Sequence, residues 1–496
     1  MMSESTVIEV ALNPYSIAAF VAYLLFIVGI GLYASKFSSK GISEYFIGGR
    51  KMNRVVVALS AVVSGRSAWL LLGVTGMAYA QGPSAIWAVL GYIIVEIFLF
   101  IYYARRLRNF TEKRNCITIP DFFAERFGDH DGKLRITIVS IFLIFMVGYI
   151  SAQFVAGGKA FSSGFGLEMN TGILLTAFIV VVYTILGGFY AVSLSDMIQA
   201  FFMILALVIL PIIAISNLGG LGELLRQLSL MDIMYVDPFA ISVGAAIGFL
   251  GIGLGSPGNP HILARYMSID DSKQLKVAAV IGTLWNVMMA WGAVFIGLAG
   301  RAYFPDISML PGEDTENLFP LLAQLHLHPL LFGVVLASIF AAIMSTADSQ
   351  LLVAASSVVR DVYEKIIKKG EKVSQKKLVL YSRAVVFLIV LIALFFGFLA
   401  EDLVFWLVLF AWAGLGASIG PTSILALYWK RTTRAGVFAG LITGTSVTVI
   451  WFYIPFLSDL MYELIPGFFA ALFATWIVSL FTSPAPDTKK AFNDMF

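Results

Sequence analysis

One short stretch of the sequence places hydroxyl and carboxyl side chains within an otherwise apolar run. It contains Ser345, Thr346, Asp348 and Ser349, and Ala342 comes one turn earlier. With helical spacing, positions 342, 345, 346 and 349 share one face, which Asp348 borders. Oxygen ligands suit hard cations, so this face suits Na⁺. Alternatively, its hydroxyl groups only hydrogen-bond to neighbouring helices.

Four ionisable residues lie inside apolar segments: Arg66, Glu96, Asp196 and Asp348. Each such charge costs roughly 2.5 to 3.5 kcal/mol near the centre of a bilayer, so it is usually paired and often marks a pathway. Three roles fit Arg66: clamping an anionic group, pairing with Asp196 or Asp348, or replacing a bound cation. Glu96 has no polar neighbours in the sequence, which favours a structural ion pair or a place near the interface.

Two apolar segments are interrupted by small residues, at Ser64–Ser67 and at Gly251–Pro260. Irregular backbone at membrane depth is tolerated where it lines a cavity or is buried in protein. Close packing of small residues is the alternative explanation for either interruption alone. Two interruptions at matching places in two halves predict a binding site near the middle of the membrane. The candidate solute-binding residues at these breaks are Arg66, Ser67, Trp69, Ser256 and Asn259.

The composition excludes a soluble globule, because 59% of the 496 residues are hydrophobic and 13% are charged. Long continuous apolar runs favour membrane-spanning helices over the alternating segments of a β-barrel. The single Cys116 and the four histidines form no metal-ligand pattern, and no nucleophile and base pair is recognisable, so an enzyme is not expected. The net charge of +3 is small, and nucleic-acid binding is not expected either.

Apolar runs and charged breaks predict about 13 transmembrane helices. Their ranges are 15–35, 55–80, 84–103, 136–158, 170–188, 190–215, 239–257, 276–299, 330–356, 379–400, 403–428, 435–456 and 464–482. Most of the 33 Lys and Arg residues then fall in alternate loops, as cytoplasmic loops require. The N-terminus is therefore expected outside and the C-terminus inside.

The spans group as one, five, five and two, and the whole chain, 1–496, is expected to be a single transporter domain. An extra helix at 15–35 precedes a first repeat at 55–215, and two extra helices at 435–482 follow a second repeat at 239–428. Each interruption falls in the first helix of its repeat. Five is an odd number, so the second repeat inserts in the opposite orientation, as an inverted repeat requires.

Several short motifs occur in an order that resembles the sodium/solute symporter family, and its sodium/proline branch most closely. They are Glu44–Arg50, Ala58–Ala61, Trp69–Gly73, Ile119–Phe123, Gly187–Phe189, Pro260–Arg265 and Met344–Thr346. The resemblance implies an all-α polytopic fold with a LeuT-like 5+5 inverted repeat. It also implies a sodium site formed by backbone carbonyls of Val63 and Arg66 with Ala342, Ser345 and Thr346.

Some members of the family have a second sodium site, which the resemblance maps to Asp196, Ser345, Asp348 and Ser349. Two regions differ from the proline branch. Gly65-Arg66 replaces an Asp-Met pair whose aspartate is needed for sodium coupling, and Ile252 and Ser256 replace a tryptophan and a tyrosine near the solute.

The expected function is sodium-coupled symport of a small organic solute by alternating access, with an amino acid or another carboxylate as the solute. The expected partners are the solute, Na⁺ and the lipid bilayer, with no cofactor, and the expected location is the cell inner membrane as a multi-pass protein. The alternative is a sodium-independent or proton-coupled transporter in which Arg66 replaces the coupling cation. A membrane sensor on the same scaffold is a further alternative.

Overall fold

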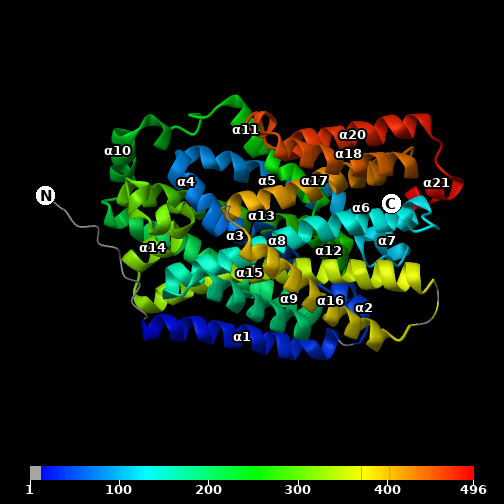
Figure 1. Cartoon of the computed structure of the whole chain (residues 1–496), viewed down its shortest axis with the longest axis horizontal. Helices are drawn as coiled ribbons and strands as arrows, with labels where there is room; N and C mark the ends of the chain where they lie inside the picture. The colour runs from blue at the N-terminus through cyan, green and yellow to red at the C-terminus, as the bar shows by residue number, and fades with distance from the viewer. Residues whose placement is uncertain (1–12, 39, 370, 372, 401–402) are drawn as a thin grey trace.

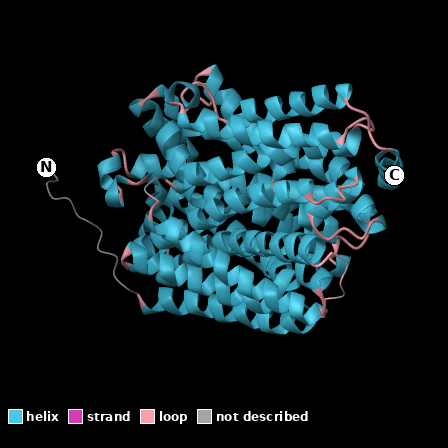
Figure 2. Ribbon diagram, turned by 45° about the vertical axis from the view of Figure 1, so that its right-hand side comes forward, coloured by secondary structure: helices cyan, strands magenta, loops and turns pink. Residues whose placement is uncertain are grey.

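The secondary structure is helical throughout the described part of the chain. The computed structural model describes residues 13–38, 40–369, 371, 373–400 and 403–496. In these ranges Met52 and Ile269 form an isolated parallel bridge between two connecting segments. Figure 2 shows helices joined by short loops. The expected all-α class is confirmed.

Ten helical stretches within the described residues are long and apolar enough to cross a membrane. They are Pro14–Lys36, Arg54–Lys113, Lys133–Phe165, Met169–Asn217, Ser272–Tyr303, Pro329–Ile367, Gln375–Phe398, Val404–Tyr428, Arg434–Tyr453 and Leu464–Phe481, and a shorter apolar stretch covers Val243–Gly258. Since a crossing needs about 20 residues, the 60-residue and 49-residue stretches are too long for single crossings.

The 60-residue stretch folds back on itself. It contains α3 (Arg54–Ala68), α4 (Thr75–Gln81), α5 (Ile86–Phe98) and α6 (Ala104–Lys113). The side chains of Arg66 and Glu96 meet at 3.2 Å, although 30 residues of straight helix would separate them by about 45 Å. The reversal lies at Gly82, which has a φ of 69°.

The 49-residue helix α9 (Met169–Asn217) also reverses, at Gly188. The Tyr183 hydroxyl donates to Ser195 Oγ at 2.6 Å, whereas twelve residues of straight helix span about 18 Å. Gly188 has a φ of 58° and a ψ of −168°, a conformation that is open to glycine and strained for other residues. The sequence predicts one span at 170–188 and the next at 190–215, and this turn lies at the boundary between them.

The remaining helices form one bundle around three central ones. These are α8 (Lys133–Phe165), α15 (Pro329–Ser356) and α17 (Val404–Tyr428), whose apolar windows are 78%, 83% and 83% buried. In Figure 1, α1 (Pro14–Ser38) lies along one edge of the bundle, and α18 (Arg434–Tyr453) and α20 (Leu464–Phe481) lie along the other. The other long helices are α13 (Leu275–Tyr303) and α16 (Gln375–Phe398).

The remaining helices are shorter. They are α2 (Ile42–Ile47), α7 (Ile119–Phe127), α10 (Leu221–Met231), α11 (Val243–Gly251), α12 (Pro260–Ser268), α14 (Leu318–His326), α19 (Pro455–Ser458) and α21 (Pro486–Phe492), with η11 (Ser357–Ile367) extending α15.

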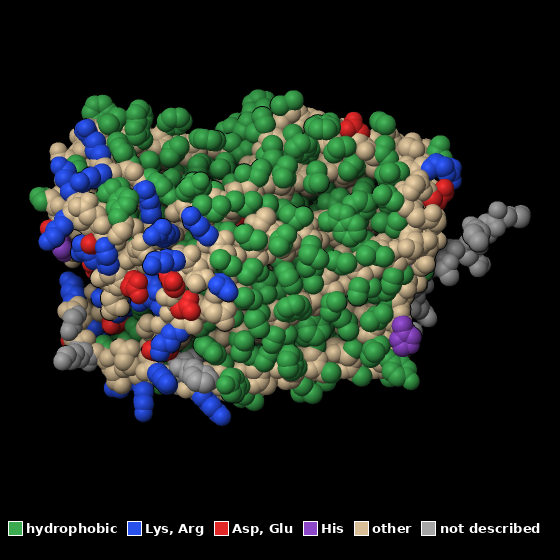
Figure 3. Space-filling model, turned by 180° about the vertical axis from the view of Figure 1, so that it is seen from behind, with side chains coloured by type: hydrophobic (Ala, Val, Ile, Leu, Met, Phe, Trp, Pro, Cys, Tyr) green, Lys and Arg blue, Asp and Glu red, His purple; other side chains and the backbone are tan. Residues whose placement is uncertain are grey.

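Charged side chains gather at one end of the bundle. Figure 3 shows apolar side chains over the middle of the visible face and Lys and Arg at the end that carries the C-terminus. Helix α1 begins at the opposite end (Figure 1). This distribution is the one that the positive-inside rule describes.

A buried ionic network fastens α7 to the charged ends of α8 and α15. Arg135 binds both Asp121 and Asp361, and Arg360 binds Asp121 at 3.1 Å. Burial alone would raise the pKa of Asp121, but the guanidinium groups of Arg360 and Arg135 outweigh it and hold that pKa below its usual value. The network therefore contains an ionised carboxylate at neutral pH.

The turn in α9 predicts the effect of a single added methyl group. Gly188→Ala should lower the free energy of unfolding by about 1 to 3 kcal/mol, because alanine is strained at this φ and ψ. Gly148→Ala is the matched control, since an added Cβ there meets nothing within 4 Å. Thermal unfolding in detergent compares the two variants, and equal unfolding temperatures would contradict the assigned turn.

Candidate solute and ion site

The first break is at Ser67, the last position of the interruption expected at residues 64 to 67. Ser67 has a φ of 50° and a ψ of −170°, a strained conformation of the kind that clusters at functional sites. Its Oγ accepts a hydrogen bond from the backbone N–H of Trp69 at 3.1 Å. The same N–H also donates to the Arg66 carbonyl. After the break the helix continues as η2 (Trp69–Val74).

The second break separates α11 from α12. Helix α11 ends at Gly251, a tighter 3₁₀ segment η6 covers Ile252–Gly258, and α12 begins at Pro260. Asn259 bridges the break, because its Nδ2 donates to the Gly255 carbonyl at 2.8 Å. Both interruptions expected from the sequence are thus irregular backbone.

An aromatic pair connects the two breaks. The Tyr92 hydroxyl on α5 donates to the Gly65 carbonyl at 3.2 Å, and its ring stacks on Trp412 of α17 at 5.3 Å. Trp412 Nε1 donates to the Ile252 carbonyl at 2.8 Å. Gly65 is required here, because an added Cβ would collide with the Tyr92 hydroxyl. The two breaks are therefore connected through Tyr92 and Trp412.

Arg66 is buried, and its ion-pair partner is Glu96. Its Nη2 lies 3.2 Å from Glu96 Oε2, and its Nε donates to Asn286 Oδ1 at 2.7 Å. Asn286 also donates to Glu96, and the guanidinium lies 3.3 Å from the centre of the Tyr92 ring. Pairing of Arg66 with Asp196 or Asp348, one expected role, is not observed. Glu96 forms the structural ion pair that its sequence neighbours favoured.

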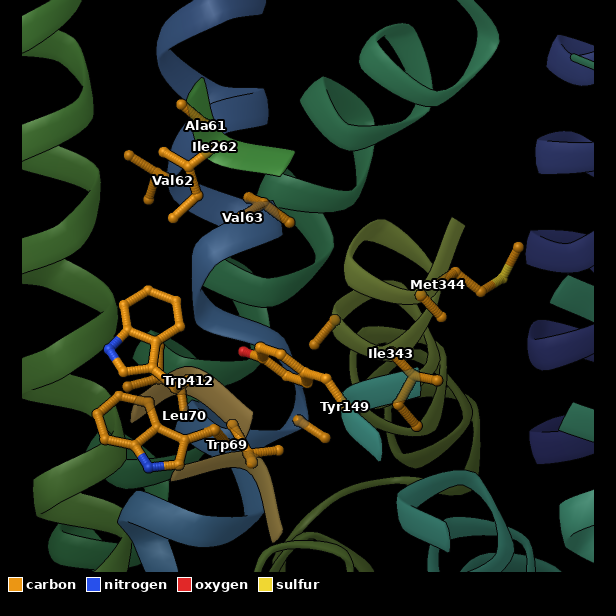
Figure 4. Packing of buried hydrophobic residues seen from close by; sticks show 14 of the residues in the cluster. Ala61, Val62, Val63, Trp69, Leu70, Tyr149, Ile262, Ile343, Met344 and Trp412 are labelled. Carbon is orange, nitrogen blue, oxygen red and sulfur yellow. The ribbon is translucent and has the colours of Figure 1, made fainter. Parts of the chain in front are cut away.

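The hydroxyl group of Thr346 on α15 faces the helix before the first break. Thr346 Oγ1 donates to the Ser64 carbonyl at 2.9 Å, and Ser345 Oγ donates to the Ala342 carbonyl at 3.0 Å. Figure 4 shows Met344 pointing away from α3, with Val63 on the helix before the break. Val63, Ala342, Ser345 and Thr346 are all buried. The structure thus brings Thr346, one of the candidate sodium ligands of α15, into contact with the interrupted helix.

Asp196 of α9 lies at the meeting point of four helices. Its Oδ2 accepts from Ser60 and Ser64 of α3, at 2.6 and 3.1 Å, and from Arg265 Nη2 of α12 at 3.1 Å. Arg265 also donates to Ser349 of α15. Asp196 and Ser349, two candidates for the second sodium site, are therefore joined through Arg265.

Asp348 completes this group of charges. Ser349 Oγ lies 3.2 Å from Asp348 Oδ1, and both residues are buried. Asp348 Oδ2 and Asp196 Oδ1 have no hydrogen-bond partner among the described residues. Buried carboxylates need compensation, so these two free oxygens have the chemistry of cation ligands.

The candidate solute residues contribute free polar atoms beside the breaks. Trp69 Nε1, Ser256 Oγ and Asn259 Oδ1 are buried without a hydrogen-bond partner among the described residues. The Trp69 ring stacks on Phe405 at 5.9 Å. Gln153 of α8 accepts from the Ala68 N–H at 3.2 Å and keeps a free Nε2. These atoms can bind a polar solute.

Figure 4 shows that Tyr149 also lies near the first break. The Tyr149 side chain extends from α8 with its hydroxyl towards α3. Its ring packs edge to face against His261 of α12, with 6.1 Å between ring centroids. Helix α8 therefore contacts the second broken segment and points towards the first.

Several side chains of the site were not predicted from the sequence, among them Tyr92, Asn286, Arg265 and Trp412. Asn286 could have been found from the sequence, because a single polar amide inside an apolar span is costly to bury, as is the carboxylate of Glu96. Arg265 lies between the expected spans 239–257 and 276–299, a position that predicts a loop, yet it is buried. Tyr92 and Trp412 resemble ordinary core aromatics until the fold places them against the breaks.

Comparison with known proteins gives a consistent match over nearly the whole chain. The profile of the sodium:solute symporter family matches residues 45–444. The chain is 39% identical over 473 residues to the high-affinity proline transporter PutP of Bacillus subtilis (strain 168), covering 94% of this chain and 98% of the relative. It is 39% identical over 475 residues to the sodium/proline symporter of Staphylococcus aureus (strain JH9), covering 93% and 91%.

Solved structures share the fold at lower identity. A Na⁺-coupled sialic acid symporter in a substrate-bound outward-open state superposes with a TM-score of 0.82 at 20% identity, covering 96% of this chain and 99% of that one. MhsT in complex with L-phenylalanine superposes with a TM-score of 0.53 at 17% identity, covering 87% and 98%. These neighbours have the LeuT fold expected from the sequence.

The Arg66–Glu96 pair predicts a non-additive pair of substitutions. Arg66→Met alone should lower the free energy of unfolding by about 3 to 5 kcal/mol, because it leaves the Glu96 carboxylate buried without a cation. The double variant Arg66→Met/Glu96→Gln should recover most of this loss. Thermal unfolding in detergent measures both.

Arg226→Met is the control, since the Arg226–Glu223 pair is exposed and should contribute little. A double variant as unstable as Arg66→Met would show that the two charges do not compensate each other.

Proposed function

Because this chain belongs to the sodium:solute symporter family, we propose that it couples the inward Na⁺ gradient to uptake of a small carboxylate-bearing solute. The solute is an amino acid or another organic acid, and the protein works by alternating access in the cell inner membrane. The contact that carries the proposal is the one between the first break and α15, where the Thr346 hydroxyl meets the Ser64 carbonyl.

The placement of Arg66 supports an external coupling ion. To replace the coupling ion, Arg66 would need its guanidinium between α3 and α15, but it binds Glu96 of α5 and Asn286 of α13 instead. The α3–α15 oxygens are then free to bind Na⁺, through the carbonyls of Val63, Arg66 and Ala342 and the hydroxyls of Ser345 and Thr346. The alternative, sodium-independent or proton-coupled transport with Arg66 replacing the cation, has less support.

The free donors beside the breaks favour a carboxylate in the solute. Trp69 Nε1, Gln153 Nε2 and Arg66 Nη1 are buried donors without partners among the described residues. Unmet buried donors cost about 1 to 3 kcal/mol each, so a ligand that satisfies them binds well. Proline is the first solute to test, because the relatives named above are proline transporters. Ile252 and Ser256 replace the tryptophan and tyrosine of the proline branch, so the solute can differ from proline.

The proposal includes the topology. Both long stretches reverse, at Gly82 and Gly188, and together with the broken segment from Val243 to Ser268 they support 13 crossings. The charged end in Figure 3 would face the cytoplasm, with the N-terminus outside and the C-terminus inside. The two repeats, 55–215 and 239–428, would then rock around the paired breaks.

Uptake into proteoliposomes tests the function. With L-proline and a panel of other amino and organic acids as radiolabelled solutes, an inward Na⁺ gradient should drive accumulation of at least one of them. Replacing Na⁺ with choline at equal ionic strength should abolish that accumulation. Uptake that persists undiminished in choline would contradict sodium coupling.

Two variants of α15 make the same experiment specific to the proposed ion site. Thr346→Val removes the hydroxyl that meets the Ser64 carbonyl, and should raise the Na⁺ concentration for half-maximal uptake about tenfold, the effect of losing about 1.4 kcal/mol. Ser338→Ala is the control, since that buried hydroxyl bonds to Val335 within its own helix. An equal effect of both substitutions would count against the site.

A further inference from the structure

Two arginine side chains of the proposed first repeat contact the last turn of α17, the final helix of the proposed second repeat. Arg126 Nε of α7 donates to the Ala426 carbonyl at 3.1 Å. Arg106 Nη1 of α6 donates to the Leu427 carbonyl at 2.9 Å. The last carbonyl groups of a helix lack partners within it, and the negative end of the helix dipole favours cations. The two proposed repeats are therefore joined here through guanidinium groups.

Arg126 is fully buried, and it forms no ion pair with a carboxylate of the described residues. Burial lowers the pKa of its guanidinium to about 10, so it stays protonated at neutral pH. A buried charge needs hydrogen-bond partners. Arg126 Nη1 donates to the Thr488 carbonyl of α21 at 2.7 Å, and the guanidinium lies 5.3 Å from the centre of the Phe492 ring. Helix α21 therefore supplies part of the environment that this cation requires.

The segment 486–495, which contains α21 and η12 (Asn493–Met495), also contacts α6. Asp494 forms an ion pair with Arg114 at 2.7 Å, and the Met495 carbonyl accepts from Asn109 Nδ2 at 3.4 Å. Figure 1 shows α21 at the same end of the bundle as α6 and α7. We call residues 486–495 the docked segment, because they contact α6 directly and meet α17 through the side chain of α7 that they cover.

The docked segment has one buried face. Its buried side chains are spaced by three and four residues, as on one side of a helix: Thr488, Ala491, Phe492 and Met495. Lys489 and Asn493, which lie between them, are exposed. A short segment that buries few apolar side chains opens at a lower free energy than the core helices do. Its contacts are thus suited to reversible docking.

We infer that the docked segment is a conformational restraint, which holds α6 and α7 of the first repeat against α17 of the second and leaves this place when the repeats move. The inference rests on the proposed function, because alternating access requires the repeats to move relative to each other. A displacement between α7 and α17 stretches the bond from Arg126 to Ala426. While Thr488 and the Phe492 ring hold the guanidinium, it cannot follow α17. Arg126 is therefore the positioning residue of this restraint.

A reversible cross-link tests the restraint in the full-length protein. In a Cys116→Ser background, Arg114→Cys and Asp494→Cys replace the ion pair with two thiols, which a short bis-methanethiosulfonate joins before reconstitution. The cross-link should lower the initial rate of Na⁺-driven uptake several-fold, because conformational steps often limit turnover. Reduction with dithiothreitol should restore the rate. The radiolabelled solute is L-proline, or the acid of the uptake panel that accumulates if proline does not.

The matched control joins two exposed positions within the docked segment. Lys489→Cys and Asn493→Cys lie one helical turn apart, so the same reagent bridges them without tying the segment to α6. This cross-link should leave the rate unchanged. If the first pair does not fold, Asn109→Cys and Met495→Cys replace it, since those residues also meet across the contact. A segment with only a structural role would raise the unfolding temperature on cross-linking and leave uptake as it was.

The outcomes separate this inference from the proposed function. If the wild type accumulates no solute of the panel in a Na⁺ gradient, the proposed function fails and the inference fails with it. If the wild type transports, but the protein that mass spectrometry shows to be cross-linked keeps the rate of its reduced form, the restraint is overturned and the proposed function stands. An equal fall in the control also overturns it. A fall that is reversed by reduction and absent from the control supports it.

Discussion

The buried ion pair of Arg66 and Glu96 determines which charged and polar groups remain available to bind an ion or a solute. A guanidinium next to the first broken helix would repel any coupling cation unless its charge were compensated. Glu96 supplies this compensation from α5, and Asn286 and the Tyr92 ring hold the guanidinium in place. The oxygens that α3, α9 and α15 direct at one another are thereby separated from this positive charge. The ion and solute sites that we propose both depend on that separation.

The same contacts connect the two broken helices mechanically. Tyr92 holds the backbone at Gly65, and Trp412 stacks on Tyr92 while it holds the carbonyl of Ile252. Ser67 keeps a strained backbone between these contacts and α15. The strain persists because the surrounding bonds fix the chain on both sides. An ion or solute bound at either break, as we propose, would therefore contact backbone that is linked to the other break.

The sequence predicted the class, the two breaks and the facing hydroxyl groups, because each leaves a local pattern: long apolar runs, glycine-rich interruptions and helical spacing. It did not predict the partner of Arg66. Glu96 is 30 residues away and becomes its neighbour only because the chain reverses at Gly82. Arg265 was missed for a related reason. A basic residue at the end of an apolar segment suggests a loop, and only the packing of α12 against α9 and α15 shows that it is buried.

A cryo-EM structure determined in Na⁺, and a second one in choline, would test the central claim most directly. The account predicts that Arg66 stays on Glu96 and Asn286 in both structures, and that density for an ion appears in Na⁺ among the oxygens of Val63, Ala342, Ser345 and Thr346. A guanidinium of Arg66 lying among those oxygens, with no ion density in Na⁺, would contradict it.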